Sequence, residues 1–496
     1  MLAKHICLII PPSPFLLNER VFISLGILRV AAVLRQENYD VEVLDLSGVV
    51  NIDDVLSAYA RLLKENITFG ITATTPQLPS AIKVRNAIRE LLPGSKIILG
   101  GPHVSLVHAA YLSEQKKNIA GRATKALKQL EENFDVSVAG DGEEAIFDAL
   151  KEGAPKLIDA ANPKSVLFLT SSQLSELPFP ARDLIDYSSY HHYIGKRNAT
   201  SLICQLGCPF GCGFCGGRKS SAFRRIRLRT TENVIAEIDH IYQTYHTDAF
   251  MFQDDELNVN PEMINLLKSL IKLQEKLGVD FVLRGYIKAQ LFTEEQAMLM
   301  YKAGFRRILV GFETATPRLL KNIQKASTLE ENTRCMEISH KYNLDVKALM
   351  SIGHPGESPE SVRAVVDWLL EVKPHDFDVT VITPYCGTSY HDDAVPNEKC
   401  PGVWTYTING DNLHVMDVDY SVVEDYYKGK PDGGYQSYVY TDFISAKELV
   451  QMRDWVEREV RTKLGIPYYD AGDIVQYKYS ADQKLRSAGI YEKNLA

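Results

Sequence analysis

The chain of 496 residues has no long apolar run and no surplus of basic residues. No segment approaches the roughly 20 apolar residues that span a membrane, and a net charge of −8 argues against a surface that coats nucleic acid. The short apolar segment His5–Ile10 runs into two prolines, which predicts a buried strand rather than a signal sequence. We expect a cytoplasmic protein with no transmembrane segment and no nucleic-acid partner, while peripheral contact with lipids stays open.

Cysteine is scarce, and its distribution excludes several kinds of site. Of eight cysteines, only three stand close together. A structural zinc site has four closed ligands, often from two separated C-x2-C pairs, and the sequence has no second pair. A disulfide framework is not expected in a chain of this length without a signal peptide. Reduced thiols agree with a cytoplasmic location.

The three clustered thiols are Cys208, Cys212 and Cys215, at C-x3-C-x2-C spacing in a loop rich in glycine. Iron–sulfur clusters are normally held by four thiolates, so three thiols suggest a four-iron cluster whose fourth iron is free to take a substrate. Cys204 would extend the pattern to four thiols, which stays open as an alternative. Because Cys204 ends an apolar run, we predict that it packs as a small hydrophobic residue.

Residues 1–155 alternate strand and helix patterns, which predicts a doubly wound, Rossmann-like parallel sheet. The predicted strands are His5–Ile10, Val41–Leu46, Thr68–Thr74, Lys96–Gly101 and Val136–Gly140, and the predicted helices are Val21–Gln36, Asp53–Lys64, Ser80–Leu91 and Glu143–Lys151. Such sheets bind ligands at the carboxyl ends of their strands, where glycine lets the backbone approach closely. The residues predicted at this crevice are Thr72, Gly100, Gly101, His103 and Gly140.

The alternation pauses in a proline-containing connector at residues 156–199 and resumes at residues 200–388. The predicted strands are Ser201–Leu206, Ala249–Gln253, Phe281–Arg284, Arg307–Phe312, Lys347–Ile352 and Asp378–Thr383. Helix patterns separate them, at Glu232–Tyr242, Pro261–Leu277, Glu294–Ala303, Leu329–Tyr342 and Pro359–Val372. Six β/α units predict a partial (β/α)6 barrel with the cysteine loop after its first strand, on the face where such barrels place active sites.

Residues 389–496 show no further α/β repeat and predict an α+β extension that caps the barrel mouth. This region contains a predicted helix at Ala446–Leu464 and is rich in tyrosine, namely Tyr420, Tyr426, Tyr427, Tyr435, Tyr438 and Tyr440. Tyrosine suits both packing and recognition, so its abundance does not decide between the two. The fold class is therefore α/β, with an α+β extension.

These features resemble the radical S-adenosylmethionine (SAM) enzymes that carry a cobalamin-binding domain. The cysteine loop resembles the signature of the superfamily, in which three thiolates hold a [4Fe–4S] cluster and the open iron binds SAM. The first half resembles the cobalamin-binding domain through the order of its segments, which are Pro11-Pro12, Ser24-Leu25-Gly26, Asp45, Gly100-Gly101-Pro102-His103 and Gly140-Asp141-Gly142-Glu143. The D-x-H-x-x-G motif that supplies a cobalt ligand in many corrinoid proteins is absent, which leaves His103 as the nearest candidate. A Rossmann-like domain with an empty crevice is the alternative.

Further segments resemble the parts of the family that hold SAM. The acidic run Asp254, Asp255 and Glu256 aligns with the G-G-E segment that binds the SAM amino group, although aspartates replace both glycines. The family pattern also implies SAM contacts for Phe214, Glu313 and Ser351, and Arg284 at a strand end could pair with the SAM carboxylate. A solvated acidic turn, and structural ion pairs for Arg284 and Glu313, are the alternatives.

One turn departs from the family pattern. The segment Thr383–Thr388 resembles a T-P-Y-P-G-T turn in which Cys386 replaces proline. Cys386 either faces the substrate or packs as a small residue.

The resemblance implies an enzyme that cleaves SAM to a 5′-deoxyadenosyl radical and transfers a methyl group from cobalamin to an unactivated carbon. The substrate would be a small molecule, a lipid or a natural-product intermediate, and an electron donor such as flavodoxin or ferredoxin would be needed. An oxidative cyclase or rearrangement enzyme without methyl transfer is the alternative. A corrinoid carrier would not need the cluster, and transfer-RNA methylthiolation is not expected, because that family carries three further cluster cysteines.

Overall fold

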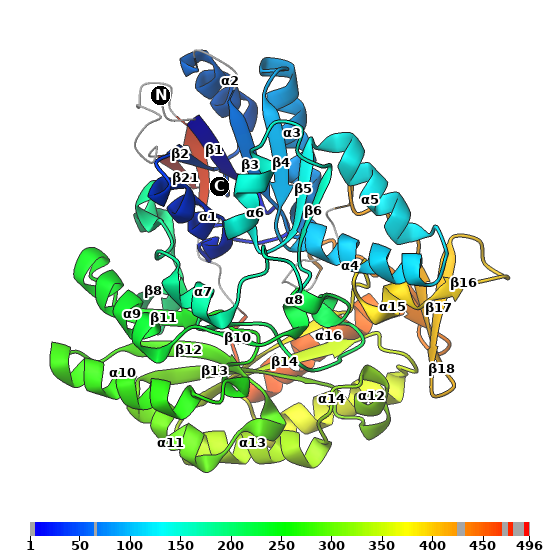
Figure 1. The fold of residues 1–496 in the computed structure, drawn as a ribbon. Coiled ribbons are helices and arrows are strands. Elements are labelled where there is room, and N and C mark those ends of the chain that lie inside the picture. Colours follow the sequence, from blue (N-terminus) through cyan, green and yellow to red (C-terminus); the bar gives the residue numbers. More distant parts are fainter. Residues whose placement is uncertain (1–4, 64–66, 424–431, 469–474, 480–490, 496) are drawn as a thin grey trace.

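The computed structural model describes residues 5–63, 67–423, 432–468, 475–479 and 491–495. Two α/β units lie against each other, the first above the second in Figure 1, and a smaller C-terminal part lies beside the second. None of the described helices is both long enough and apolar enough to cross a bilayer.

The first unit is a six-stranded parallel sheet in the order β2-β1-β3-β4-β5-β6. Its strands are β1 His5–Ile10, β2 Asp40–Asp45, β3 Thr68–Thr72, β4 Lys96–Gly100, β5 Val136–Gly140 and β6 Leu157–Ala160. Its helices are α1 Leu25–Gln36, α2 Ile52–Leu62, α3 Leu78–Leu91, α4 Pro102–Lys116, α5 Arg122–Asn133 and α6 Gly142–Ala149. Successive residues of β4 enter different cores, Ile97 and Leu99 on one face and Ile98 on the other, because side chains alternate along a strand.

The sequence predicted five of these six strands and missed two helices. Strand β6 lies within the predicted connector, so the first sheet extends beyond residue 155. Helix α4 is buried at every residue from His103 to Ala110, so it lacks the one-sided apolar pattern by which a surface helix is detected. Helix α5 buries one face through Ala123, Leu127 and Leu130, and this pattern was overlooked.

The second unit is an open barrel with the strand order β15-β14-β13-β12-β11-β8-β7. The parallel strands are β8 Arg197–Leu202, β11 Ala249–Phe252, β12 Val282–Ile287, β13 Phe305–Glu313, β14 Asp345–Ile352 and β15 Asp376–Val381, and β7 Tyr193–Ile194 pairs antiparallel with β8. The outer helices are α9 Thr231–Tyr245, α10 Met263–Leu277, α11 Glu294–Lys302, α12 Pro317–Ile323, α13 Leu329–Lys341 and α14 Pro359–Val372. The main core lies between these helices and the sheet. The prediction of six β/α units is confirmed.

Short elements connect and frame the barrel. The connector contains α7 Ser171–Glu176, and the cysteine loop lies among β9 Gln205–Leu206, α8 Ser221–Arg224 and β10 Arg227–Leu228. Strands β9 and β10 pair with each other.

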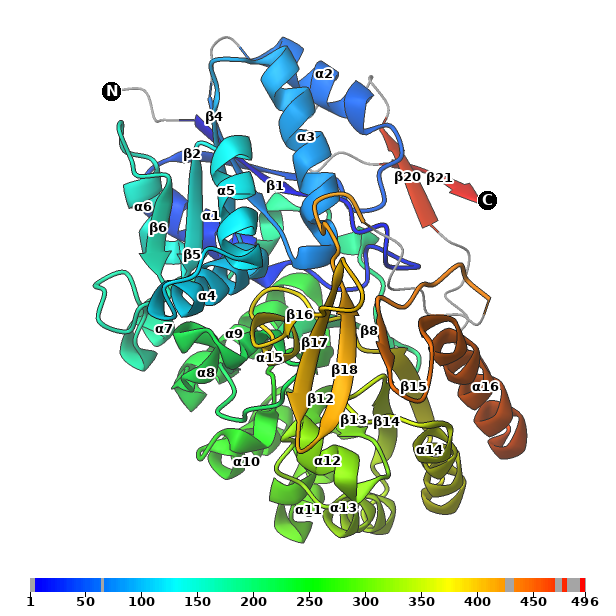
Figure 2. The ribbon, with the colours of Figure 1, turned by 90° about the vertical axis from the view of Figure 1, so that its right-hand side faces the viewer.

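The C-terminal part contains a small antiparallel sheet that the sequence did not predict. Its strands are β16 Val395–Pro396, β17 Val403–Ile408, β18 Asp411–Met416 and β19 Val439–Thr441, and Figure 2 shows β17 and β18 in front of the barrel. The other elements are α15 Ser389–Asp392, α16 Ala446–Leu464 and the pair β20 Val475–Tyr479 and β21 Tyr491–Leu495. Helix α16 has its predicted bounds. Tyr426 and Tyr427 lie outside the described residues.

Candidate active site

The cysteine loop follows β9 and is fixed by hydrogen bonds on both flanks. The Cys208 N–H donates to the Phe223 carbonyl at 2.8 Å, and the Gly213 N–H donates to the Ile323 carbonyl at 2.8 Å. Gly213 leaves no room for a side chain, because a Cβ there would lie 2.5 Å from the Tyr390 ring. Neighbouring segments of the chain therefore fix both flanks of the loop.

The loop carries the three predicted thiols of Cys208, Cys212 and Cys215. Burial raises the pKa of Cys208 to about 11, so this thiol stays protonated until a metal displaces its proton. Among the described residues, no three His, Cys, Asp or Glu side chains are placed to hold a single metal ion. A four-iron cluster places a different demand on the loop, because each thiolate binds a separate iron.

Cys204 lies apart from these thiols. Its side chain is 1% exposed and packs in the barrel core with Leu202 and Phe252. Its N–H donates to Asp254 Oδ1 at 2.9 Å. These contacts support the prediction of a small packed residue over that of a fourth ligand.

The three carboxylates of the acidic run have different surroundings. Asp254 accepts the backbone N–H of Gln205 at 2.6 Å as well as that of Cys204, so one of its oxygens fastens the end of β8 rather than holding SAM. Asp255 lines a crevice between the two units. Burial raises the pKa of Glu256 to about 7, against the opposing charge of Lys325. Of the three predicted ligands of the SAM amino group, Glu256 is the one whose surroundings suit that role.

Two lysines near Glu256 were missed by sequence reasoning. Lys288 Nζ donates to the Lys325 carbonyl at 3.0 Å and lies 4.4 Å from the centre of the Phe210 ring. Lys325 Nζ pairs with Glu313 at 2.8 Å. A correct end for β12 would have shown that Lys288 follows a barrel strand directly, whereas Lys325 lies in a turn with no recognisable pattern.

A chain of buried hydrogen bonds fixes the Glu313 carboxylate. Ser351 Oγ donates to Glu313 Oε2 at 2.7 Å and lies 2.8 Å from His354 Nε2, while His354 Nδ1 lies 3.3 Å from the Tyr390 hydroxyl. Because the serine has one proton to give, His354 carries its proton on Nε2 and accepts from Tyr390. Burial lowers the pKa of His354 to about 4, so it is neutral. Burial alone would raise the pKa of Glu313, but Lys325 and Ser351 hold it below its usual value.

A cavity of about 310 Å³ lies beside this chain, and we call it the upper cavity. It brings together the three predicted residues Phe214, Glu313 and Ser351. Other lining residues are Phe15, Pro76, Thr380 and Tyr385. The cavity is therefore formed at the carboxyl ends of the barrel strands, next to the cysteine loop.

Arg284 is not where the sequence predicted. Strand β12 runs to Ile287, so Arg284 lies within the strand and pairs in register with Arg307 of β13. Glu313 lies six positions beyond Arg307 on β13, which is about 20 Å along an extended strand. Arg284 lines a different cavity from Glu313 and Ser351, so its position does not support the predicted pairing with the SAM carboxylate. The strand was predicted too short because Gly285 interrupts its apolar pattern.

A crevice of about 440 Å³ lies between the two units, and we call it the interdomain crevice. Four of the five predicted residues line it, namely Thr72, Gly100, Gly101 and Gly140, and the barrel contributes Leu206, Gln253 and Asp255. A Cβ at Gly100 would meet no atom within 4 Å, so the backbone there is open to a ligand. Gly101 differs, because its φ is +97° and a Cβ would lie 2.7 Å from Thr72 Oγ1. Open backbone at a strand end fits a large planar cofactor such as a corrin.

His103, the fifth predicted residue, is not at the crevice. It lies in the first turn of α4, where Nδ1 lies 3.0 Å from Thr75 Oγ1, and burial lowers its pKa to about 4. It lines a separate cavity of about 220 Å³, so its position does not support the role of cobalt ligand for which it was the nearest candidate. Cys386 lines that same cavity and packs in the core of the first unit, which supports packing over substrate contact.

Buried ion pairs fasten the two units around the crevice. Arg182 of the connector pairs with Glu237 of α9 at 2.7 Å, and both side chains are at most 2% exposed. Arg229 also pairs with Glu237, and Arg227 of β10 pairs with Asp141 of the first unit. Removing one partner of such a pair leaves an uncompensated buried charge, so the units are set firmly in one relative position.

Two family models match the chain. The model of the radical SAM superfamily matches residues 202–369, and the model of the B12 binding domain matches residues 19–131. The first covers the cysteine loop and most of the barrel strands, and the second covers much of the first sheet.

Curated proteins and solved structures resemble the chain over most of its length. An uncharacterized methyltransferase PH0819 of Pyrococcus horikoshii is 25% identical to this chain, and the alignment covers 80% of this chain and 84% of the relative. An anaerobic magnesium-protoporphyrin IX monomethyl ester cyclase of Rubrivivax gelatinosus is 24% identical and covers 67% of this chain and 59% of its own. The structure of the radical SAM methyltransferase TsrM from Kitasatospora setae, with cobalamin and a [4Fe–4S] cluster bound, has a TM-score of 0.62 at 19% identity and covers 83% of this chain and 82% of its own.

The matched domains agree with the sequence motifs and with the fold. A radical SAM domain works with a [4Fe–4S] cluster and SAM, and a B12-binding domain works with cobalamin, so the predicted cofactors are confirmed at the level of domains. The likeness to TsrM confirms the predicted fold class. The chain therefore carries a radical SAM domain with a B12-binding domain ahead of it.

Proposed function

We propose that the protein is a cobalamin-dependent methyltransferase that acts on an unactivated carbon of a small molecule, a lipid or a natural-product intermediate. The observation that carries the proposal is the position of the two cavities on either side of one turn. Thr74 and Gln77 line the interdomain crevice, whereas Pro76 between them lines the upper cavity. A methyl carrier and a radical source must reach the same carbon, and this turn brings their sites together.

The residues of the chain bind and orient the cofactors in this proposal. Cys208, Cys212 and Cys215 would hold the cluster, Glu256 would accept the SAM ammonium, and Glu313 with Ser351 would line the SAM site. When bound, the cluster with SAM supplies a 5′-deoxyadenosyl radical and cobalamin supplies a methyl group. The protein supplies binding, orientation and exclusion of water. We further propose a cytoplasmic location and an electron donor such as flavodoxin or ferredoxin.

The likeness to the magnesium-protoporphyrin cyclase favours a second candidate, an oxidative cyclase or rearrangement enzyme that makes no new methyl group. A substrate-independent experiment separates the two. The protein is reconstituted without oxygen with iron, sulfide and hydroxocobalamin, then incubated with a reductant and SAM. The methyltransferase should retain corrin through gel filtration and form both 5′-deoxyadenosine and S-adenosylhomocysteine. Formation of 5′-deoxyadenosine alone would contradict methyl transfer and put the cyclase first.

A further inference from the structure

A fourth cavity adjoins the upper one inside the barrel, and we call it the lower cavity. Its volume is about 290 Å³. Inner-face residues of β12 to β15 form one wall, and residues 15–18, 21 and 22 of the first unit with the side chains of α16 form the other. Phe15 and Thr380 line both the lower and the upper cavity, so the two adjoin.

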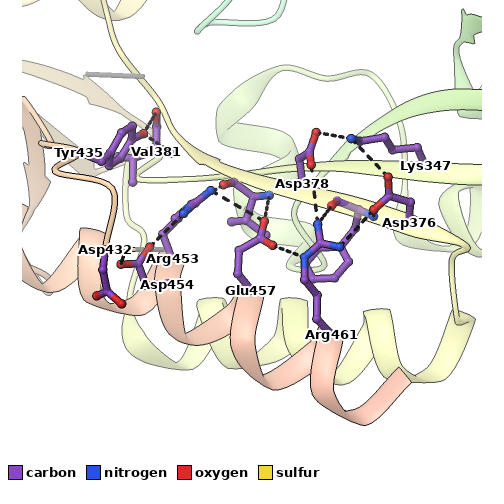
Figure 3. A network of polar contacts seen from close by, with 12 residues as sticks. Lys347, Asp376, Asp378, Val381, Asp432, Tyr435, Arg453, Asp454, Glu457 and Arg461 are labelled. Atoms are coloured by element: carbon purple, nitrogen blue, oxygen red, sulfur yellow. Dashed lines mark hydrogen bonds and ion pairs between the residues drawn. The ribbon is translucent and has the colours of Figure 1, made fainter. Parts of the chain in front are cut away.

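The acidic side chains of the lower cavity already have cationic partners. Asp376 and Asp378 pair with Lys347 at 3.4 and 2.7 Å. Glu457 of α16 pairs with Arg461 at 2.6 Å, and Arg461 also reaches Asp376 at 3.3 Å. Figure 3 shows these side chains meeting between α16 and β15. Each of these carboxylates therefore has at least one cationic partner within the network.

One cation of the cavity is left without a partner. Arg284 makes no hydrogen bond or ion pair with any residue that the structure describes, and its Nε is buried without a partner. The adjacent Arg307 has a partner of its own, because it pairs with Asp345 at 3.7 Å. His192 is 6% exposed and its Nε2 also lacks a partner within the described chain. The Arg284 side chain is half-buried, its Nε is enclosed without a hydrogen-bond partner, and a partly desolvated cation without a partner is unfavourable. This end of the cavity therefore suits an anion.

The rest of the lining is mainly apolar. Phe15, Leu16, Val21 and Phe22 contribute side chains from the first unit. The Tyr435 hydroxyl is engaged by the backbone of Val381, at 2.9 Å to its N–H and 3.1 Å to its carbonyl. The ring of Tyr435 thus adds a mainly hydrocarbon surface to the wall. A ligand of the cavity would therefore have an apolar body.

We propose that the lower cavity holds the anionic end, a carboxylate or a phosphate, of an elongated and otherwise apolar substrate, with Arg284 as its counter-ion. This inference rests on the proposed function, because the other end of the molecule would reach the upper cavity beside the cysteine loop. The guanidinium suits both anions, since it donates in a planar, bidentate arrangement. The length of about 20 Å between the levels of Arg284 and Glu313 requires an extended molecule.

The experiment compares three ligands that share one body, namely octyl phosphate, octanoate and 1-octanol. Binding to the reconstituted holoenzyme is measured by calorimetry. Wild-type protein should bind at least one anion tenfold or more tightly than 1-octanol, and the two anionic arms show whether phosphate or carboxylate is preferred. Arg284→Met should remove this preference while octanol binding stays unchanged, and Arg284→Lys should restore part of it. Arg363→Met, which changes an exposed arginine of α14, is the matched control.

The outcomes are separate from those for the proposed function. Equal binding of all three ligands to wild-type protein would overturn the anion site, and this comparison needs no variant to fold. An anion preference that survives Arg284→Met, with corrin and iron retained, would overturn the role of Arg284. If wild-type protein forms no S-adenosylhomocysteine yet prefers the anions, methyl transfer fails and the anion site stands.

Discussion

The residues around the cysteine loop form a rigid frame rather than a set of free ligands. The Glu313 carboxylate accepts a hydrogen bond from the Ser351 hydroxyl and pairs with the Lys325 ammonium group. The hydrogen bond between Ser351 and His354 holds the histidine in one tautomer. Glu256 lies near this group without a direct ion pair among the described residues. The Glu256 carboxylate is therefore able to pair with the ammonium group of SAM.

The first prediction concerns the cluster ligands. Replacing Cys208, Cys212 or Cys215 by Ala should abolish the iron–sulfur absorption and SAM cleavage. Cys204→Ala should keep the iron and lose only about 1 kcal/mol of stability, as expected for a small cavity in a core. Iron and sulfide analysis of the purified variants measures this. Loss of as much iron from Cys204→Ala as from the other three would point to a four-thiol site.

The second prediction concerns SAM. Glu256→Gln should keep the cluster and weaken SAM binding by roughly 1.5–3 kcal/mol, because one charge-assisted hydrogen bond is lost. Calorimetry with SAM measures the change. Glu275→Gln on the exposed face of α10 is the control and should bind SAM like wild-type protein. Unaltered affinity in Glu256→Gln would remove the role proposed for this carboxylate.

At the scale of elements, the barrel strands end in tight turns that bury charge. After β14 the chain turns through Gly353 to Glu357, whose carboxylate accepts the Gly353 N–H at 3.2 Å and the Ser361 hydroxyl. Burial raises the pKa of Glu357 to about 7 from 4.5. The turn is thus most stable when this buried carboxyl is protonated.

The third prediction is a pH dependence of stability. Because the pKa of Glu357 is higher in the folded than in the unfolded state, its protonation stabilises the folded protein. This contribution is fully present below pH 4.5 and is lost as the pH rises through about 7. Each unit of difference between the folded and unfolded pKa corresponds to about 1.4 kcal/mol. Between pH 5 and pH 8, the free energy of unfolding of wild-type protein should therefore fall by about 2–3 kcal/mol through this group. Glu357→Gln cannot titrate at this position, so its free energy of unfolding should lack that part of the fall. Denaturant titration at both pH values checks this, and parallel losses in the two proteins would contradict it.

Elements with strong periodicity could be predicted from the sequence, and elements shaped by tertiary contacts could not. The predicted bounds of α16 agree with the structure, where Ser445 and Glu448 form a capping box at the start of the helix. Helix α4 was missed because it is buried on all sides. The thiols, Glu256 and the crevice glycines follow from spacing and strand ends, whereas Lys325 and the position of Arg284 depend on strand register, which no local pattern determines.

At the scale of the whole molecule, the two sheets direct their carboxyl ends toward each other. The buried ion pairs Arg182–Glu237 and Arg227–Asp141 hold this arrangement. The interdomain crevice exists only in the joined form, because residues of both units line it. Binding of a cofactor there should add to the stability of the joined form by mass action.

The fourth prediction tests that crevice. Gly100→Leu should fold and keep the cluster but retain little corrin, because its side chain enters open space at the crevice. Gly101→Leu should instead unfold at a lower temperature, since its Cβ would meet Thr72 and Ala73. Gel filtration with hydroxocobalamin and thermal unfolding measure the two effects. Full corrin retention by Gly100→Leu would exclude the crevice as the corrin site.

Strand β15 forms one edge of the barrel sheet, and side chains of α16 bind its backbone. The Val379 N–H donates to Glu457 at 3.0 Å, its carbonyl accepts from Arg453 at 2.8 Å, and the Phe377 carbonyl accepts from Arg461 at 2.6 Å. An exposed strand edge is a template on which other chains add and aggregate. Side chains of α16 form hydrogen bonds with backbone groups at the edge of β15, although α16 itself is a helix. The helix thereby ends the growth of the sheet and keeps copies of the enzyme from joining edge to edge.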